Sequence, residues 1–412
     1  MLTITFLKFI IIKKCYKYTF LSKKEKKVPK TKVTVIDIGS KSVRVLIANS
    51  GGVNSLSVAG YAECDYAGYY EGEFLEEEKL QDVFSKVLLS AQSVANASVD
   101  KVYVGVPANF SLCRTKTLTQ NFGQRVKILD DDVTQLYTMA DDLKNEDYVL
   151  ISASPIEFQL DDGTITTYPV GKKSNKLTAT VSMIYAEKNF IEKINDILKK
   201  SGVASVEYLS SPLCECLYLL PKERRAEGAI VVDCGYIETA VCVAKGDGLV
   251  DLKSFAVGGG HVSADLMECL DITFDEAEQL RKQLVLSVNA SDSDDYEITR
   301  NNSLVPISMK QANEITYARI EMIASLVERC VKNGDETMPY YLTGGGLSYT
   351  KGAKEVLANY LGKNITLLYP KDLHLNKPHY SALLGMAEYV INQVEKQNKS
   401  FISKLIDKFI KR

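Results

Sequence analysis

The sequence predicts an α/β protein with two lobes that share one kind of core, and three observations support this. Residues 33–48 read as a buried strand, the tight turn Asp37-Ile-Gly39 and a second buried strand. The same order of strand, Asp-x-Gly turn and strand returns at residues 229–244, which indicates a duplicated fold. A chain of 412 residues is also long enough for two or more domains.

Composition excludes several classes of function. Hydrophobic residues make up 46% of the chain and charged residues 25%, as in ordinary soluble globular proteins. The net charge of −2 argues against a nucleic-acid partner, because such proteins usually carry a strong basic excess. Nine scattered cysteines without a Cys-x-x-Cys pair fit reduced thiols, and three histidines without ligand spacing make zinc chemistry and Ser-His-Asp chemistry improbable.

The first 32 residues differ from the rest of the chain. Residues 2–12 are apolar but interrupted by Lys8, and a lysine-rich run follows to residue 32. The apolar part is too short to span a bilayer, and its basic residues lie on the wrong side for a secretory signal. We expect a disordered basic extension, with a peripheral membrane contact as the alternative.

Apolar spacing places the remaining elements. Helices are expected over residues 78–95, 130–143, 187–201, 258–270, 273–286, 308–333 and 381–393. Residues 287–303 are polar and acidic and are expected to form a surface loop. The expected domains are a first-lobe core (33–98, 184–226, 370–393), an inserted α+β subdomain (99–183), a second-lobe core (227–260, 336–369), a second-lobe small subdomain (261–335), and a linker with a terminal helix (394–412).

Three glycine-containing turns follow strands at wide spacing: Asp37-Ile-Gly39, Asp233-Cys-Gly235 and Gly344-Gly-Gly346. One such turn alone is also an ordinary hairpin. Two facing turns of this kind can offer backbone N–H groups to phosphates, and their carboxylates can hold hydrated magnesium. The third, which lacks Cβ atoms, would let the backbone lie flat against an adenine ring.

This ordered trio resembles the actin-like ATPase superfamily, and within it the chain is similar to the FtsA family of bacterial cell-division proteins from residue 33 to the end. Four further segments carry the narrower resemblance: Tyr168-Pro-Val-Gly171, Val257-Gly-Gly with Val262-Ser-Ala-Asp265, Ala277-Glu-Gln-Leu-Arg281, and Lys377-Pro-His-Tyr-Ser381 with Leu384-Gly-Met. The resemblance implies two lobes with ribonuclease-H-like cores, an inserted small α+β subdomain used for polymer contacts, and a C-terminal amphipathic helix.

The resemblance also implies ATP and magnesium in the cleft between the lobes, with Glu278 and Arg281 at the ribose and adenine and magnesium held through water by two aspartates. The residues expected at the nucleotide are Asp37, Gly39, Ser40, Lys41, Ser42, Asp233, Gly235, Thr239, Glu278, Arg281, Gly344, Gly345 and Gly346. The implied function is to polymerise on the cytoplasmic face of the membrane at the division site and to tether FtsZ. The C-terminal peptide of FtsZ would dock on residues 261–335, with Arg319 as a contact.

The second phosphate turn departs from the family pattern Asp-x-Gly-Gly-Gly-Thr-Thr-Asp. Tyr236 and Ile237 add bulk there, Glu238 adds a negative charge, and Ala240 replaces a carboxylate. A like charge about 4–5 Å from a phosphate costs on the order of 3–4 kcal/mol at an effective dielectric of 20. We expect weakened nucleotide binding and at most slow ATP hydrolysis, unless these side chains point away from the cleft.

The last fourteen residues form a basic amphipathic pattern after a polar linker at 394–399. The apolar residues that share one helical face are Phe401, Ile402, Leu405, Ile406, Phe409 and Ile410, with Lys404 and Lys408 on the flanks. This pattern is typical of a membrane-surface anchor for anionic lipid. The alternative is a terminal helix packed on the protein's own core.

Two other functions remain open. One is an actin-like scaffold for pilus or secretion assembly resembling PilM, of which no basic C-terminal amphipathic helix is expected. The other is a sugar-kinase-type enzyme, which needs an intact phosphate turn where this chain has residues 236–240 altered.

Overall fold

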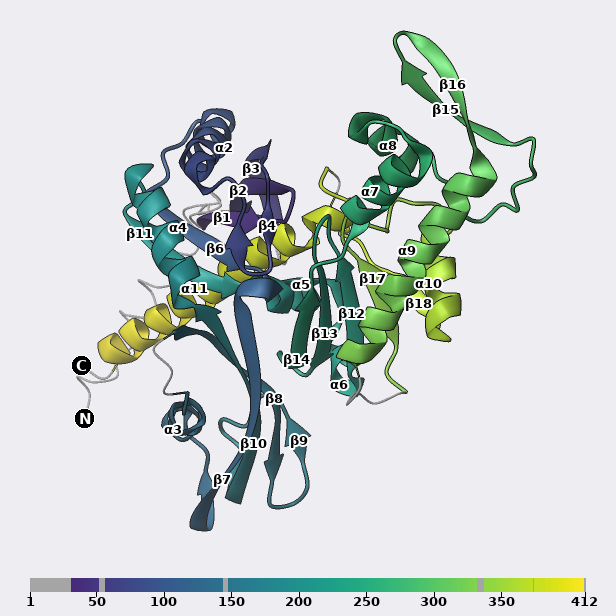
Figure 1. Cartoon of the computed structure of the whole chain (residues 1–412). Helices are drawn as coiled ribbons and strands as arrows, with labels where there is room; N and C mark the ends of the chain where they lie inside the picture. Colours follow the sequence, from purple (N-terminus) through teal and green to yellow (C-terminus); the bar gives the residue numbers. More distant parts are fainter. Residues whose placement is uncertain (1–30, 52–55, 144–146, 332–336, 373, 411–412) are drawn as a thin grey trace, which may run out of the picture.

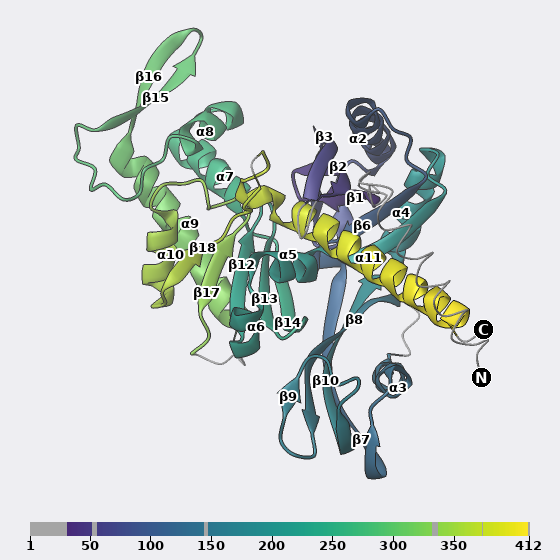
Figure 2. The same cartoon turned by 180° about the vertical axis from the view of Figure 1, so that it is seen from behind.

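The structure is a computed structural model that describes residues 31–51, 56–143, 147–331, 337–372 and 374–410, with side chains described as far as residue 395. Two lobes lie side by side, a separate antiparallel sheet extends from the first lobe, and a long helix crosses that lobe (Figures 1 and 2). The basic extension expected over residues 1–32 lies, except for its last two residues, outside the described residues.

The first lobe is built on a five-stranded sheet. In sheet order its strands are β11 (Ser205–Ser210), β6 (Lys101–Val106), β1 (Lys32–Ile38), β2 (Ser42–Ser50) and β3 (Leu56–Asp65). The strands β1, β2 and β3 form an antiparallel meander, whereas β6 and β11 run parallel to β1. The sheet therefore combines two consecutive hairpins with two crossover strands.

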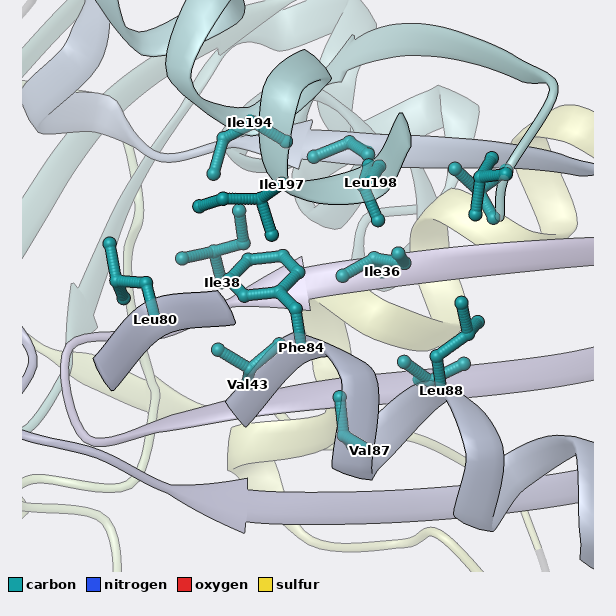
Figure 3. Close-up of a cluster of buried hydrophobic side chains, with 14 of the residues drawn as sticks. Ile36, Ile38, Val43, Leu80, Phe84, Val87, Leu88, Ile194, Ile197 and Leu198 are labelled. Carbon is teal, nitrogen blue, oxygen red and sulfur yellow. The ribbon is translucent and has the colours of Figure 1, made fainter. Parts of the chain in front are cut away.

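Helices cover both faces of this sheet, which is why β1 and β2 are almost continuously apolar. On one face, Ile36 and Ile38 pack with Phe84 of α2 (Leu80–Ala95) and Ile194 of α4 (Lys188–Lys200), as Figure 3 shows. The alternate residues of β1 point the other way, where Val33 and Val35 share a cluster with residues of α5 (Ser211–Leu219) and α11 (Ser381–Ile410).

The second lobe repeats this topology. Its sheet has the order β14 (Gly248–Phe255), β13 (Thr239–Lys245), β12 (Ala229–Cys234), β17 (Tyr340–Thr343) and β18 (Ile365–Leu367). Again a central strand begins an antiparallel meander and has parallel strands on its other side. One face packs against α9 (Met309–Cys330) and α10 (Ala353–Leu361), and the other packs against α5. The duplicated two-lobed fold expected from the sequence is confirmed.

The inserted subdomain is an antiparallel sheet with one helix. Its strands, in sheet order, are β7 (Ser111–Lys127), β10 (Lys173–Glu187), β8 (Tyr148–Leu160) and β9 (Ile165–Thr166), and its helix is α3 (Asp130–Ala140). The expected insert of residues 99–183 included β6, but this strand pairs with β1 in the first sheet. Strand pairing across the chain decides this boundary, and the apolar pattern of β6 alone does not reveal it.

A small unit of two helices and a hairpin sits on top of the second lobe (Figure 1). It consists of α7 (Gly259–Leu270), α8 (Phe274–Arg281), β15 (Asp295–Arg300) and β16 (Ser303–Ser308). The expected surface loop at 287–303 is wrong in part, because this hairpin begins within it. Asn301 and Asn302 have φ of 51° and 61°, the left-handed conformation that a two-residue hairpin turn needs, while Tyr296 and Ile298 are buried on alternate positions.

The expected polar linker at 394–399 is also wrong, because α11 runs without a break from Ser381 to Ile410. The linker sequence Val-Glu-Lys-Gln-Asn-Lys holds no Gly or Pro, and Glu, Lys and Gln are good helix formers. The remaining elements are α6 (Lys222–Glu227), β4 (Tyr69–Tyr70), β5 (Glu73–Phe74) and three-residue 3-10 helices at Glu77–Lys79, Ala108–Phe110 and Pro378–Tyr380. Among the described residues, no helix has the length and apolar character to cross a bilayer.

Candidate functional site

A cavity of about 450 Å³ lies between the two lobes, and all three glycine turns line it. The first turn joins β1 to β2, the second joins β12 to β13, and the third follows β17. Each turn therefore stands at the end of the central strand of its sheet or of that strand's parallel neighbour. The duplicated topology brings segments far apart in the sequence to one place.

The first turn is closed by its own backbone. The Gly39 N–H donates to the Ser42 carbonyl at 3.0 Å, and the Tyr66 hydroxyl donates to the Gly39 carbonyl at 2.8 Å. The Ser42 hydroxyl donates to Glu63 Oε1 at 2.5 Å. Residues 37–42 all line the cavity.

Asp37 in this turn carries an ion pair that was not expected from the sequence. The β1–β2 register sets Asp37 opposite Arg44, and Arg44 Nη1 lies 3.0 Å from Asp37 Oδ2. Arg44 Nε also donates to Glu63 Oε1 at 2.8 Å. Burial raises the pKa of Asp37, and the Arg44 charge opposes that rise. The signal for this pair was a lone arginine in an otherwise buried apolar strand.

Asp233 in the second turn has a different environment. Burial raises its pKa to about 6, the nearby Asp37 charge adds to the rise, and Arg44 opposes it. The two turns also touch: the Ile237 N–H donates to Ser40 Oγ across the cleft at 3.0 Å. The side chain of Ile237 lies beside Gly68, where a Cβ would be 3.0 Å from Ile237 Cδ1.

Two buried glutamates line the inner part of the cavity. Glu238 is 8% exposed, its Oε1 has no hydrogen-bond partner among the described residues, and burial raises its pKa to about 7. Glu215 of α5 is 2% exposed, and burial together with the Asp233 charge raises its pKa. Glu215 is not among the residues expected from the sequence, although an acid within the apolar run of α5 is a usable signal.

The third turn packs directly on the second. Gly344 has φ of 86°, and a Cβ there would lie 2.1 Å from Asp233 Oδ1. The Gly346 N–H donates to the Cys234 carbonyl at 2.6 Å. These contacts require glycine, because no side chain would fit between the two turns.

Charged side chains join the lobes at the mouth of the cavity. Lys41 Nζ of the first lobe lies 3.5 Å from Glu278 Oε2 of the second, and Arg281 Nε donates to Glu278 Oε1 at 3.1 Å. Although burial raises the pKa of Glu278, the hydrogen bonds from Arg281 and Ser263 lower it to about 2. Glu278 is therefore charged and engaged within the protein.

Most of the residues expected at the nucleotide line this one cavity: Asp37, Gly39, Ser40, Lys41, Ser42, Asp233, Gly235, Arg281, Gly344 and Gly345. Glu278 and Gly346 stand just behind this lining, in contact with Arg281. Thr239 does not line the cavity, because it is fully buried in β13 and its hydroxyl donates to the Val257 carbonyl at 2.7 Å. Lys377 and His379 line the cavity and were not expected.

The expected partner and membrane residues lie away from this cavity. Arg319 on α9 makes two hydrogen bonds to Asp265 of α7, at 2.6 and 2.5 Å. The backbone of residues 401–410 is helical within α11. The side chains expected to contact lipid lie outside the described side chains: Phe401, Ile402, Lys404, Leu405, Ile406, Lys408, Phe409 and Ile410.

Comparison with known proteins agrees with this architecture. The family described as "Cell division protein FtsA" matches residues 230–385. Cell division protein FtsA of Bacillus subtilis (strain 168) is 20% identical over 384 residues, covering 91% of this chain and 87% of the relative. That of Streptococcus pneumoniae serotype 2 is 22% identical over 366 residues, covering 86% and 79%.

Solved structures share the fold. A PilM–PilN type IV pilus biogenesis complex matches with a TM-score of 0.60 at 14% identity, covering 88% of this chain and 99% of the other. MreB5 of Spiroplasma citri bound to AMPPNP matches with a TM-score of 0.56 at 11% identity, covering 90% and 98%. The two duplicated sheets and the cleft with three glycine turns give this chain an actin-like fold, and its sequence is similar to FtsA proteins over most of its length.

Proposed function

We propose that this protein binds ATP in the cleft and acts as an FtsA-type membrane scaffold for cell division. The observation that carries the nucleotide part is the meeting of three glycine turns on one cavity between two lobes. Related folds give support, since MreB5 of Spiroplasma citri has been solved with AMPPNP and with ADP.

The cavity has the size and wall chemistry for a nucleotide. Its volume of about 450 Å³ falls within the usual range for ligand pockets. Its basic side chains are Lys41, Arg44, Arg281 and Lys377, and its acidic ones are Asp37, Glu63, Asp65, Glu215, Asp233 and Glu238. Burial favours the neutral forms of Glu215 and Glu238. The acidic side chains would therefore repel bound phosphates less strongly than their number implies.

Magnesium fits the same site. Asp37 and Asp233 both line the cavity, and magnesium is usually bound by one or two carboxylates together with substrate phosphates and water. Among the described residues, no cluster of three or more metal-binding side chains is present, so phosphates and water would have to complete the shell. When bound, the ion would offset the charge that the phosphates bring to these carboxylates.

Hydrolysis should be slow at most. Glu238 lies on the cavity wall with one oxygen that has no hydrogen-bond partner among the described residues, and Tyr236 of the same turn also lines the cavity. These side chains occupy the turn whose backbone N–H groups would otherwise stabilise the charge that phosphoryl transfer builds up. ATP would therefore serve as a structural or switching ligand.

The membrane part of the proposal rests on the sequence of α11. Residues 401–412 would bind anionic lipid at the cytoplasmic face of the membrane at the division site. Single anchors of this size bind reversibly, and filaments of many subunits would bind by avidity. The FtsZ C-terminal peptide would dock on the small unit of α7, α8, β15 and β16 and on α9, with Arg319 as a contact.

Thermal denaturation with Mg-ATP tests the nucleotide proposal. A ligand at one hundred times its Kd adds about 2.7 kcal/mol to the free energy of unfolding, so the wild-type Tm should rise by several degrees. Asp233→Asn should lose the magnesium-dependent part of that rise. Asp251→Asn, on β14 and outside the cavity, is the matched control and should keep it. A wild-type protein whose Tm ignores Mg-ATP would contradict the proposal.

Two binding assays test the scaffold proposal. Removal of residues 401–412 should abolish co-sedimentation with vesicles that contain phosphatidylglycerol. Arg319→Ala should weaken capture of the FtsZ C-terminal peptide, whereas Arg329→Ala, exposed on the same helix, should not. Equal binding by the truncated and full chains, or no capture of the peptide by the wild type, would overturn the corresponding part.

A further inference from the structure

Tyr236 holds its ring at the mouth of the cavity. Its carbonyl accepts a hydrogen bond from the Gly260 N–H at 2.7 Å, which fixes the second turn to the start of α7. A Cβ on Gly260 would lie 2.8 Å from the Tyr236 ring carbon Cε1. The ring therefore packs against the glycine backbone at the start of α7.

Two cations lie over this ring. Lys41 Nζ is 4.4 Å from the ring centroid, and Arg281 Cζ is 5.9 Å from it. Both side chains line the cavity. Cations at such distances are attracted by the negative face of an aromatic ring. The same two cations also contact Glu278, at 3.5 and 3.1 Å.

These contacts bridge the two lobes beside the cavity. Lys41 belongs to the first lobe, whereas Tyr236, Glu278 and Arg281 belong to the second. The chain thus supplies an aromatic ring and an anion to cations that a ligand would otherwise engage. A nucleoside phosphate consists of those two parts, a flat ring and an anion.

We propose that Tyr236 occupies the place of a ligand's aromatic ring, and so determines how strongly this cleft prefers a nucleoside phosphate over a simple polyphosphate. This inference rests on the proposed nucleotide function. A flat surface of glycine backbone with cations facing it suits a purine as well as a phenol, so the two rings would compete for it. A polyphosphate has no ring and needs only the turns and their cations.

The expected effect follows from this competition. The wild type should bind Mg-ATP and magnesium tripolyphosphate with similar affinity, because the cost of displacing the Tyr236 ring offsets the contacts that the base gains. Tyr236→Gly should bind Mg-ATP about tenfold more tightly, a change of about 1.4 kcal/mol, which is in the range for a cation–ring contact that is partly desolvated. Its affinity for tripolyphosphate should change less than threefold.

Isothermal titration of the full chain with both ligands tests the proposal, with Tyr236→Phe as the control. The phenylalanine variant keeps the ring and should resemble the wild type. Equal gains for ATP and tripolyphosphate in Tyr236→Gly would overturn the proposal, because they would mean that the substitution only frees the two cations. No gain for ATP would overturn it as well. If neither ligand binds any of the three proteins, the nucleotide function itself fails.

A second measurement uses only the wild type, in case the glycine variant does not fold. Nitration of Tyr236 by tetranitromethane, mapped by mass spectrometry, should increase at saturating Mg-ATP and stay unchanged with tripolyphosphate. Displacement of the ring exposes the phenol only when the ligand brings a ring of its own. Nitration that does not increase with ATP, or that increases equally with both ligands, would contradict the inference.

Discussion

The turns after β1 and β12 occupy equivalent places in the two lobes, yet their carboxylates differ in ion pairing and in the charged neighbours that act on their pKa values. Asp37 is balanced within its own hairpin by Arg44 at 3.0 Å. Asp233 makes no such ion pair with the described residues, and burial raises its pKa to about 6. The first turn also presents the hydroxyls of Ser40 and Ser42, whereas the second presents Tyr236 and Glu238.

This difference indicates that the first turn is better suited than the second to an anionic ligand. Arg44 balances the charge of Asp37 in the first turn, so a bound phosphate would meet backbone N–H groups and hydroxyls there. The second turn adds a buried carboxylate and a tyrosine ring to the same cavity. We therefore expect the first turn to contribute more to phosphate binding, although duplication gave both turns the same backbone.

The largest expected effect comes from removing the balance in the first turn. Arg44→Ala leaves Asp37 buried without its cation, and loss of one partner of a buried ion pair typically costs about 3–5 kcal/mol. The side chains of Arg44 and Asp37 are 11% and 8% exposed, so solvent screens this pair little. Urea denaturation at pH 7 measures the loss.

Arg125→Ala provides the comparison for that measurement. Arg125 pairs with Asp161 and Asp162 on the surface of the inserted subdomain, and its own side chain is 57% exposed. Its removal should leave the urea midpoint nearly unchanged. Similar losses for the two variants would mean that the pair in the first turn is not specially dependent on its cation.

An intermediate effect is expected in the second turn, and it depends on pH. Because the pKa of Glu238 is raised to about 7 in the folded protein, from 4.5, the folded state holds a proton that the unfolded state has lost between these values. The contribution of Glu238 to the free energy of unfolding is therefore fully present below about pH 4.5 and is lost as the pH rises to about 7. Glu238→Gln should gain about 2–3 kcal/mol relative to wild type between pH 5 and pH 8.

Urea titrations of both proteins at several pH values measure that difference. The slope that the buried Asp233 contributes has the same sign in both proteins, and the comparison removes the part of it that is independent of the Glu238 charge. A constant difference between wild type and variant across this pH range would show that Glu238 is charged throughout and that the second turn tolerates the charge.

The smallest effect concerns the contact between the turns. Ser40→Ala removes the acceptor of the Ile237 N–H and should cost about 1 kcal/mol, the usual net value of one hydrogen bond. Hydrogen exchange should accelerate at the Ile237 amide. Ser42→Ala removes a hydroxyl that bonds Glu63 within the first lobe and should leave this amide protected. Equal exchange at Ile237 in both variants would argue against a tie between the lobes.

The sequence predicted the parts of the site that depend on local pattern. Asp37, Gly39, Asp233, Gly235 and Gly344 could be found because a strand, a carboxylate and a glycine follow in a fixed order. Duplication then required their turns to meet. The cavity between two lobes is a consequence of that repeat.

Contacts that depend on pairing across the chain were not predictable in the same way. Arg44 faces Asp37 only through the β1–β2 register, and Glu215 reaches the cavity only because α5 packs between the two sheets. The linker at 394–399 looked polar, but polarity does not interrupt a helix when Gly and Pro are absent. Thr239 sits in a turn motif, yet strand pleating turns it into the core.

The unbroken α11 has a mechanical consequence. A helix of 30 residues is about 45 Å long, and its first half is packed against β1, β2 and α5 of the first lobe. Because the helix is continuous, its far end moves together with the first lobe. A surface that binds the last turns of α11 would therefore fix the orientation of the first lobe as well as its distance from that surface. The second lobe would be oriented only through its contacts with the first, which include the Ser40–Ile237 hydrogen bond and the Lys41–Glu278 ion pair.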